Sequence, residues 1–255
     1  MITAGVDAGA REVKAVIVKD GRIVGRAIII PATDTESAVN AVFDEALKEA
    51  GLTRGDVDKI AATGAGRRHV SFIPNHLTEV TAVARGAHAL FPEAGTIIDI
   101  GAEEGRVVKI DEAGKVMDFA VNDKCAAGAG AFIEAMARAL ETTVGQLGSL
   151  SLKSTKAVPI NAQCAVFAES EVVTLVHAKT PPEDIARAVH DAISGRIASM
   201  VHRVGVNSEI VLVGGVARNI GFVESLKRDL ESEIFIPEGP EFVGAYGAAL
   251  YAIEK

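Results

Sequence analysis

The sequence predicts an α/β protein with two similar halves, each a mixed sheet with helices on both faces. A strand, an Asp-x-Gly turn and a β-hairpin occur in residues 2–30, and the same order recurs in residues 96–121. Segments with the apolar spacing of helices follow each copy. The pattern indicates an internal duplication, with one half at residues 1–92 and the other at residues 93–255. A coincidence of two unrelated hairpins is the alternative.

The elements of the first half follow from local signals. The dipeptide Asp20-Gly21 between two β-branched runs predicts a tight hairpin. Apolar residues at helical spacing then predict an amphipathic helix. The predicted elements are strands at residues 13–18, 23–30 and 60–62, a helix at residues 37–50 and a loop at residues 63–67.

The second half is predicted to repeat the hairpin and then to become mainly helical. The pair Pro181-Pro182 favours a helix start, because proline suits a first helical turn. Residues 237–240 (Pro-Glu-Gly-Pro) break the chain before a last helix, which is expected to pack back on the first half. The predicted strands cover residues 96–98, 106–110, 116–121, 210–213 and 234–236, and the helices cover residues 131–140, 164–177, 181–204, 223–230 and 243–253.

The composition limits the classes of function. Of the 255 residues, 49% are hydrophobic and 24% are charged, which is typical of a soluble globular protein. The net charge of −8 disfavours a nucleic-acid or anionic-membrane partner. The sequence has no apolar run of transmembrane length and no signal-peptide pattern at its start. We therefore expect a cytoplasmic protein without a structural disulfide.

Three glycine-bearing turns after short apolar strands indicate a phosphate ligand. They lie at residues 7–10 (Asp-Ala-Gly-Ala), 99–102 (Asp-Ile-Gly-Ala) and 213–216 (Val-Gly-Gly-Val). Glycine allows close approach of the backbone, and the N–H groups of such turns bind phosphate oxygens. Carboxylates suit a hydrated divalent cation, so Asp7 and Asp99 are the candidate Mg²⁺ ligands. The pattern predicts a nucleotide held in a cleft between the halves, and ordinary turn chemistry is the alternative.

Two other nucleotide-binding signatures are missing from the sequence. It contains no Walker A motif and no Gly-x-Gly-x-x-Gly turn after a strand. P-loop and dinucleotide-binding folds are therefore poor explanations of the glycine turns.

The two cysteines stand in similar surroundings. Cys125 lies in Asn-Asp-Lys-Cys-Ala-Ala-Gly-Ala-Gly, and Cys164 lies in Asn-Ala-Gln-Cys-Ala-Val-Phe-Ala-Glu. Each separates a polar turn from an alanine-rich predicted helix. Two thiolates cannot complete a four-thiolate metal or iron–sulfur site, whereas two chains related by a two-fold axis can. The alternative is that both are small buried hydrophobic residues.

With these motifs the chain resembles a known group of ATPases. The duplicated Asp-x-Gly hairpins and the Gly-Gly turn are similar to the duplicated actin/hexokinase-like (ribonuclease H-like) ATPase fold. The cysteine motifs narrow the resemblance to the iron–sulfur ATPases that activate 2-hydroxyacyl-CoA dehydratases and drive benzoyl-CoA reductases. The resemblance also includes residues 63–67 (Thr-Gly-Ala-Gly-Arg), 214–219 (Gly-Gly-Val-Ala-Arg-Asn) and 244–249 (Gly-Ala-Tyr-Gly-Ala-Ala).

The resemblance implies a cofactor and partners. Two subunits, identical or paralogous, would share one 4Fe–4S cluster through Cys125 and Cys164 of each, in a helix–cluster–helix arrangement at the dimer interface. Each subunit would bind MgATP. Hydrolysis would let an electron from a ferredoxin-type donor pass at low potential to a CoA-ester reductase or dehydratase. The candidate nucleotide-binding residues are Gly9, Ala10, Arg11, Lys14, Gly101, Ala102, Gly214, Gly215, Val216 and Asn219.

Both Asp-x-Gly turns depart from the family pattern. The first commonly carries Ser or Thr after its glycine, whereas Ala10 stands here, so Arg11 is the candidate to replace the hydroxyl. The second usually reads Asp-Ile-Gly-Gly-Gln-Asp in dehydratase activators. Here Glu103 replaces the Gln, which looks closer to benzoyl-CoA reductase ATPases. Glu103 is then either the base for the attacking water or a solvated carboxylate. Lys14 is either a phosphate contact or a surface residue.

These features lead to a functional prediction. With Glu103, Asp99 and Asp7 as the catalytic residues, the chain is predicted to be an ATP-hydrolysing electron donor to benzoyl-CoA reductase. Activation of a 2-hydroxyacyl-CoA dehydratase is the alternative. A small-molecule kinase of the same fold would leave the paired cysteines unexplained. A nucleotide sensor or scaffold protein without turnover is a further alternative, with which the altered first turn is compatible.

Overall fold

The computed structural model describes residues 1–31, 34–122, 130–160 and 165–255. The chain forms two compact units. The first consists of Met1–Ala94, Ile110–Met117 and Glu238–Lys255, and the second of Gly95–Lys109 and Asp118–Pro237. The predicted division into residues 1–92 and 93–255 stays a prediction. Cys125 and Cys164 lie outside the described residues.

The first unit contains a five-stranded mixed sheet. Strand β1 is antiparallel to β2 and parallel to β4, and β2 is antiparallel to β3. Asp20 and Gly21, both with positive φ, form the predicted tight turn between β2 and β3. In the sheet order, the strands are β3 (Arg22–Ile29), β2 (Val13–Lys19), β1 (Ile2–Ala8), β4 (Lys59–Thr63) and β5 (Asn75–His76).

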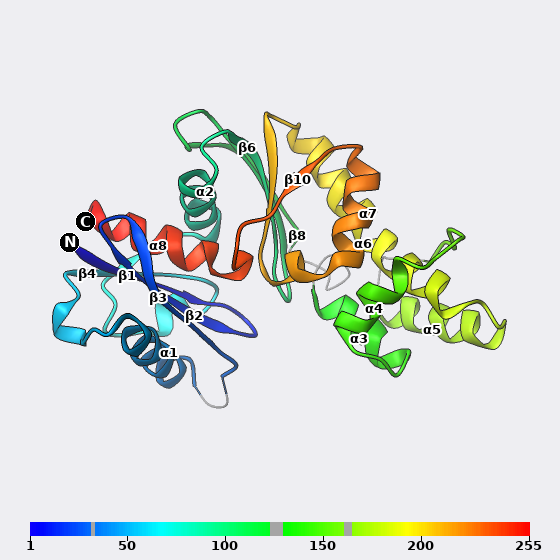
Figure 1. Cartoon of the computed structure of the whole chain (residues 1–255), viewed down its shortest axis with the longest axis horizontal. Helices are drawn as coiled ribbons and strands as arrows, with labels where there is room; N and C mark the ends of the chain where they lie inside the picture. Colours follow the sequence, from blue (N-terminus) through cyan, green and yellow to red (C-terminus); the bar gives the residue numbers. More distant parts are fainter. Residues whose placement is uncertain (32–33, 123–129, 161–164) are drawn as a thin grey trace. The chain divides into compact units, whose positions relative to one another are not determined.

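Three helices pack in this unit: α1 (Thr35–Ala50), α2 (Glu79–Leu90) and α8 (Val243–Ile253). Helix α1 packs on β2 and β3, while α8 packs on β1 and β4 and contacts α2 (Figure 1). The Asp34 carboxylate caps α1 by accepting a hydrogen bond from the Ser37 amide at 2.9 Å.

Helix α8 approaches its neighbours through glycine. A Cβ atom at Gly247 would lie 1.8 Å from the carbonyl oxygen of Ala82 in α2. A Cβ at Gly5 in β1 would lie 1.9 Å from the carbonyl oxygen of Ala245. Such distances are far inside van der Waals contact, so the packing of α8 requires glycine at both positions.

The second unit contains a sheet with the same strand order. The strands are β10 (Ile234–Phe235), β9 (Glu209–Val213), β6 (Ala94–Ile100), β7 (Gly105–Ile110) and β8 (Val116–Asn122), in that order. Strands β6 to β10 therefore occupy the places that β1 to β5 occupy in the first sheet. This equivalence confirms the duplicated α/β fold predicted from the sequence.

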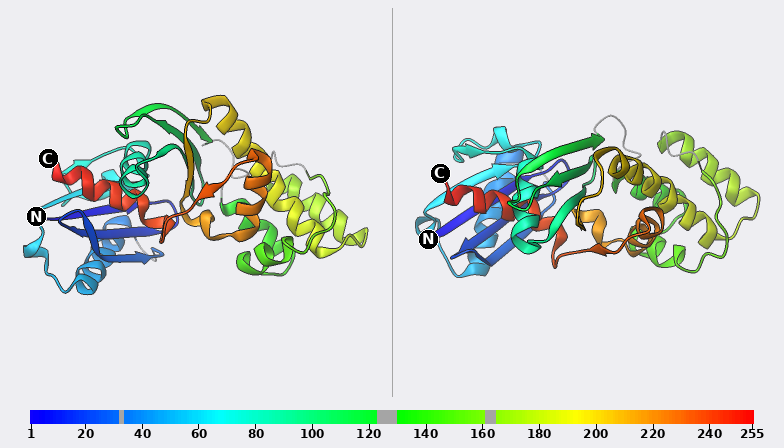
Figure 2. Two further views of the ribbon diagram at one scale, coloured as in Figure 1. Left: turned by 45° about the horizontal axis from the view of Figure 1, so that its top comes forward. Right: turned by 90° about the horizontal axis from the view of Figure 1, so that it is seen from above.

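The helices of the second unit are α3 (Gly130–Ala139), α4 (Val144–Ser151), α5 (Ala165–His177), α6 (Pro182–Val204) and α7 (Ile220–Leu230). They share one apolar core with the sheet, which includes Phe132, Ile185, Leu212 and Phe222. Helices α6 and α7 lie beside the sheet, and α3, α4 and α5 lie further from it (Figures 1 and 2). In the described part of the chain, no helix is long and apolar enough to cross a membrane.

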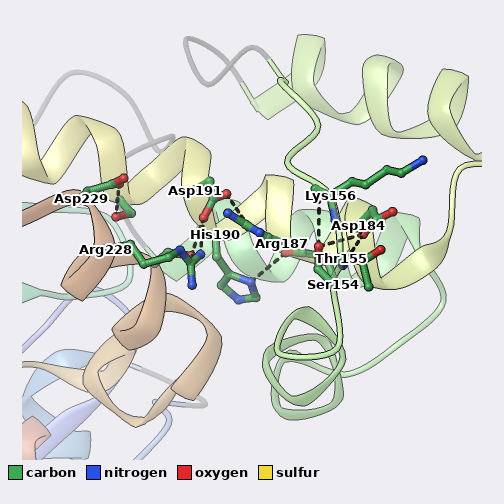
Figure 3. A network of polar contacts seen from close by, with 12 residues as sticks. Ser154, Thr155, Lys156, Asp184, Arg187, His190, Asp191, Arg228 and Asp229 are labelled. Carbon is green, nitrogen blue, oxygen red and sulfur yellow. Dashed lines mark hydrogen bonds and ion pairs between the residues drawn. The ribbon is translucent and has the colours of Figure 1, made fainter. Parts of the chain in front are cut away.

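Polar contacts connect α6 to its neighbours at several places along its length (Figure 3). Near its start, Asp184 Oδ1 accepts hydrogen bonds from Ser154 Oγ at 2.8 Å, from the Thr155 amide at 3.0 Å and from the Lys156 amide at 3.1 Å. These hydrogen bonds lower the pKa of Asp184, and the bond from Ser154 has the largest effect. The segment that precedes residue 161 is thereby fixed to the start of α6.

Further along α6, Asp191 connects the helix to α7. Its carboxylate accepts hydrogen bonds from Ser225 Oγ at 2.6 Å and from the Arg228 guanidinium at 2.7 Å, and it pairs with Arg187 at 3.1 Å (Figure 3). Helix α7 follows the Gly-Gly turn in the chain. The contacts of Asp191 with Ser225 and Arg228 therefore fix α7, the helix that follows this turn, to α6.

Candidate phosphate-binding turns

The first Asp-x-Gly turn follows β1 and is closed by its own backbone. The Gly9 amide donates a hydrogen bond to the Glu12 carbonyl oxygen at 3.1 Å. Asp7 and Lys14 are register partners on β1 and β2, so their side chains lie next to each other. Lys14 Nζ is 3.9 Å from Asp7 Oδ2 and 3.6 Å from Glu12 Oε2. One ammonium group thus lies near two carboxylates.

The second turn, after β6, repeats this arrangement. The Gly101 amide donates to the Glu104 carbonyl oxygen at 2.9 Å, and Asp99 is the register partner of Arg106. The Arg106 guanidinium is 2.9 Å from Asp99 Oδ2, and it also pairs with the Glu104 carboxylate. Glu12 and Glu104 were not among the residues predicted from the sequence to belong to the site. They become visible when the two turns are aligned residue by residue from the aspartate onward.

The two aspartates differ in how tightly a cation engages them. The Asp99 and Arg106 side chains are each only 11% exposed and form a close ion pair, whereas Lys14 lies 3.9 Å from Asp7. Mg²⁺ is usually held by one or two carboxylates together with waters and phosphate oxygens. Asp99 would have to give up part of its contact with Arg106 to bind Mg²⁺, and the assignment of Asp7 and Asp99 as Mg²⁺ ligands stays a prediction.

A glycine with positive φ lies against each aspartate. Gly64 follows β4 with φ 91°, and Gly214 follows β9 with φ 85°. A Cβ at Gly64 would lie 2.6 Å from Asp7 Oδ1, and one at Gly214 would lie 2.7 Å from Asp99 Oδ1. Both positions therefore need glycine for conformation and for space. The loop at residues 63–67 is thus the counterpart of the Gly-Gly turn, an equivalence that the sequence analysis missed.

The loop after β4 is fixed to the first turn by hydrogen bonds. The Gly66 amide donates to the Ala8 carbonyl oxygen at 2.9 Å, and Arg67 donates to the Gly64 carbonyl oxygen at 2.8 Å. Arg67 also pairs with Glu79 at 3.6 Å. The loop and the turn therefore form one structure at the end of β1 and β4.

The second turn is joined to the start of α3. The amides of Gly130 and Ala131 donate to the carbonyl oxygens of Gly101 and Ala102, each at 2.8 Å. A Cβ at Gly130 would also lie 3.1 Å from Val216 Cγ2, next to the Gly-Gly turn. Residues of the second turn, of the Gly-Gly turn and of the first turn of α3 thus meet at Gly130.

The remaining predicted residues divide into exposed and buried ones. Ala10, Arg11, Glu103 and Gly215 are exposed on their turns. Asn219 is buried, and its Oδ1 caps α7 by accepting from the amides of Gly221 at 3.0 Å and Phe222 at 3.2 Å. The structure therefore gives Asn219 a structural role. The roles of all these residues in nucleotide binding stay predictions.

His190 in α6 is a buried residue that no sequence pattern singles out. Its Nδ1 is 2.8 Å from the Ala186 carbonyl oxygen, and a Cβ at Gly221 would lie 2.9 Å from its Cε1. Burial lowers the pKa of His190 to about 4, although the hydrogen bond to the Ala186 carbonyl oxygen and the nearby Asp191 carboxylate act to raise it. A neutral imidazole thus lies beside the Asn219 cap of α7.

The chain is similar to several known proteins over its full length. It is 41% identical over 256 residues to the 2-hydroxyisocaproyl-CoA dehydratase activator of Clostridioides difficile, covering 100% of this chain and 96% of that protein. It is 37% identical to the activator of lactoyl-CoA dehydratase of Anaerotignum propionicum, covering 100% and 98%. It is 34% identical to a subunit of the benzoyl-CoA reductase of Thauera aromatica, covering 98% and 92%.

Solved structures agree with the fold. The activator of the 2-hydroxyisocaproyl-CoA dehydratase from Clostridium difficile with bound ADPNP superposes with a TM-score of 0.94, covering 100% of this chain and 95% of that chain, at 41% identity. Component A of the (R)-2-hydroxyglutaryl-CoA dehydratase of Acidaminococcus fermentans gives 0.96 at 36% identity, covering 100% and 98%. A ROK family glucokinase from Streptomyces griseus shares the fold alone, with a TM-score of 0.60 at 15% identity, covering 100% of each chain.

The aligned turns, the glycines beside each aspartate and the duplicated sheets all lie within one family pattern. That pattern, described as the BadF/BadG/BcrA/BcrD ATPase family, matches residues 4–252. The match covers nearly the whole chain, and the chain therefore belongs to the BadF/BadG/BcrA/BcrD ATPase family.

Proposed function

We propose that this protein is the ATP-hydrolysing activator of a 2-hydroxyacyl-CoA dehydratase and donates a low-potential electron to that enzyme. The observation that carries the proposal is the full-length similarity to three dehydratase activators. The identities are 41% to the 2-hydroxyisocaproyl-CoA protein and 37% to both the lactoyl-CoA and the (R)-2-hydroxyglutaryl-CoA proteins.

This choice revises the sequence-based preference for benzoyl-CoA reductase. That preference depended on Glu103 in the second turn. The benzoyl-CoA reductase protein of Thauera aromatica is less similar, at 34% identity, than the three activators. The preference for benzoyl-CoA reductase depended on one turn residue, whereas the similarity to the activators extends over the whole chain. The dehydratase activator is therefore the better supported assignment.

The nucleotide part of the proposal assigns roles to the two Asp-x-Gly turns. The Gly9 and Gly101 amides close the two Asp-x-Gly turns, so the other backbone amides of these turns and those of the Gly-Gly turn bind phosphate oxygens, and Asp7 holds the hydrated Mg²⁺. Asp99 and Arg106 form a fixed ion pair that keeps the second turn in shape. Glu103, exposed on this turn, is the proposed base for the attacking water.

The electron-transfer part concerns Cys125 and Cys164. Two cysteines from each of two chains match the four thiolates of a 4Fe–4S cluster, which would supply one-electron chemistry at low potential when bound. Helix α3 begins five residues after Cys125, and its first amides bond to the carbonyl groups of the second turn. Phosphate binding at this turn would therefore act on the start of α3.

The test is an anaerobic activation assay with a ferredoxin-type or chemical reductant and MgATP. The protein is mixed with dehydratases for 2-hydroxyisocaproyl-CoA, lactoyl-CoA and 2-hydroxyglutaryl-CoA, and separately with benzoyl-CoA reductase lacking its own ATPase subunits. We expect ATP-dependent activation of at least one dehydratase, and none with the Asp7→Asn variant. Support of benzoyl-CoA reduction with none of the dehydratases activated would contradict the proposal.

A further inference from the structure

We propose that His190 in α6 is a positioning residue: its imidazole Nε2 accepts a hydrogen bond from the Asn219 side-chain amide, directly or through one water, and so holds the Gly-Gly turn in shape. This role rests on the proposed nucleotide binding at that turn. Both side chains are buried, with 0% of His190 and 6% of Asn219 exposed. Neither His190 Nε2 nor Asn219 Nδ2 has a hydrogen-bond partner among the described residues. Two such buried atoms destabilise a fold unless they satisfy each other or share a water.

The neighbours of each side chain decide which of its atoms donate and which accept. His190 Nδ1 is 2.8 Å from the Ala186 carbonyl oxygen, which only accepts, so Nδ1 carries the proton (Figure 3). A neutral imidazole has one N–H, so Nε2 is left as an acceptor. Asn219 Oδ1 accepts from the amides of Gly221 and Phe222, which leaves Nδ2 as the donor. The two atoms without partners are therefore chemically complementary.

The imidazole and the Asn219 side chain lie at the same point, where two glycines allow close packing. A Cβ at Gly221 would lie 2.9 Å from His190 Cε1, and one at Gly148 would lie 2.6 Å from Asn219 Oδ1. Asn219 is also among the side chains close enough to affect the pKa of His190. The two atoms are not in hydrogen-bond geometry with each other, so a small side-chain rotation or one bridging water completes the contact.

Asn219 is the residue at which the Gly-Gly turn ends and α7 begins. The Ala217 amide donates to the Gly214 carbonyl oxygen at 3.2 Å, and the Asn219 amide donates to the Val216 carbonyl oxygen at 2.9 Å. At the other end of the turn, a Cβ at Gly214 would lie 2.4 Å from the carbonyl oxygen of Ile100 in β6. The turn is therefore fixed to the sheet at its start, and the imidazole fixes its end to α6.

Two substitutions separate the two hydrogen-bonding sides of the imidazole. The amide of His190→Asn reaches the place of Nδ1, so it keeps a donor to the Ala186 carbonyl oxygen and loses the acceptor towards Asn219. The longer His190→Gln side chain reaches the place of Nε2, so its amide oxygen keeps the acceptor and the bond to Ala186 is lost. If the contact with Asn219 positions the turn, only the first change should weaken nucleotide binding.

Ser194 offers a matched control on the same helix. It is also 0% exposed, and its Oγ donates a hydrogen bond to the Asp229 carboxylate in α7 (Figure 3). Ser194→Ala therefore removes another buried polar contact between α6 and α7. Asp229 lies near the far end of α7 from Asn219, so this change leaves the end of the Gly-Gly turn as it is.

The experiment measures ADP binding by calorimetry in MgCl₂ for the full chain and its His190→Asn, His190→Gln and Ser194→Ala variants. Melting temperatures without nucleotide are recorded alongside. We expect about fivefold weaker ADP binding in His190→Asn, the effect of one neutral hydrogen bond. Binding should be unchanged in His190→Gln and Ser194→Ala. All three melting temperatures should fall, because each variant loses a buried polar contact.

A second measurement observes the imidazole in the unaltered protein. A long-range ¹H–¹⁵N spectrum is recorded at a pH above 6.5, the ordinary histidine pKa, and the His190 signal is assigned by its loss in His190→Gln. We expect the proton on Nδ1 and none on Nε2, as the contact with Ala186 requires. A spectrum that shows the proton on Nε2 would overturn the role of His190, because Nε2 could not then accept from Asn219.

The binding data can overturn the role independently. Unchanged ADP affinity in His190→Asn would do so, and so would an equal loss in His190→Gln or in Ser194→Ala, since affinity would then follow stability alone. If the unaltered protein binds no ADP, the proposed function fails and the role of His190 fails with it. The two failures are therefore distinguishable.

Discussion

At the scale of single residues, the two aspartates of the duplicated turns have diverged. Asp99 is engaged by Arg106, whose guanidinium also pairs with Glu104, whereas the Lys14 ammonium lies at the longer distance of 3.9 Å from Asp7. A planar guanidinium can serve two carboxylates at once, and an ammonium group does so with less geometric fit. Arg106 therefore holds Asp99 more closely than Lys14 holds Asp7.

This difference predicts that removing the Arg106 or the Lys14 side chain lowers the free energy of unfolding by unequal amounts. Arg106→Ala takes the closely paired guanidinium from the nearly buried Asp99 carboxylate, so the free energy of unfolding should fall by about 3 kcal/mol. Lys14→Ala should cost less, because Lys14 Nζ lies 3.9 Å from Asp7 Oδ2, which is beyond hydrogen-bond length. Urea unfolding of both variants measures the difference. Equal losses would contradict the divergent roles.

His190 predicts a specific pH dependence of stability. Its pKa is about 4 in the folded protein and 6.5 in the unfolded chain. Between these values only the unfolded state binds the proton, so stability falls as the pH decreases from 6.5 towards 4. The full shift corresponds to about 3 kcal/mol.

The measurement is urea unfolding at several pH values for the natural protein and for His190→Gln. The variant keeps all carboxylates, including Asp184, so the difference between the two proteins isolates the imidazole. We expect a shallower loss of stability between pH 6.5 and 4.5 in His190→Gln. If both proteins lose the same stability between pH 6.5 and 4.5, the lowered pKa of His190 is contradicted.

At the scale of elements, the close packing of α8 requires glycine at the points of contact. Gly247→Ala would place a methyl group on the backbone of α2 and should cost about 3 kcal/mol of stability. Gly195→Ala in α6 is the control, because nothing lies within 4 Å of its added Cβ, and it should stabilise by about 1 kcal/mol. Thermal melting compares the two. Equal effects would contradict the packing assigned to α8.

The sequence predicted some elements better than others for physical reasons. Helices α6 and α8 have clear boundaries, because Pro182 and the Pro-Glu-Gly-Pro break mark their starts. Helices α2 and α4 were missing from the predicted elements. Their signals are side-chain caps at Thr78 and Thr143, with a Gln at the third position of α4, which are easily lost among turn residues.

The candidate site was also predictable only in part. The Asp-x-Gly turns follow from sequence because aspartate and glycine at fixed spacing carry the chemistry themselves. The places of Gly64 and Gly214 beside the aspartates depend on which strands are neighbours, as does the pairing of Thr63 with Asp7. Strand order is a tertiary property, so local sequence patterns could not supply these contacts.

At the scale of the whole molecule, duplication has given two units with the same strand order and different attachments. In the second unit the turn after β6 bonds to α3, whereas the turn after β1 bonds to the loop behind β4. Within the described ranges, the second unit is therefore the one that joins a candidate phosphate-binding turn to α3, a helix that follows a cysteine in the sequence. This asymmetry is what an ATPase that acts on a cluster would require.

Iron content tests most directly whether the chain is an ATP-driven electron donor. The protein is purified anaerobically, and iron and sulfide are measured per two chains for the natural sequence and for Cys125→Ser and Cys164→Ser. We expect about four irons per two chains, lost in both variants, with ADP binding retained. Protein that stays free of iron after anaerobic reconstitution, yet binds ADP, would contradict the account.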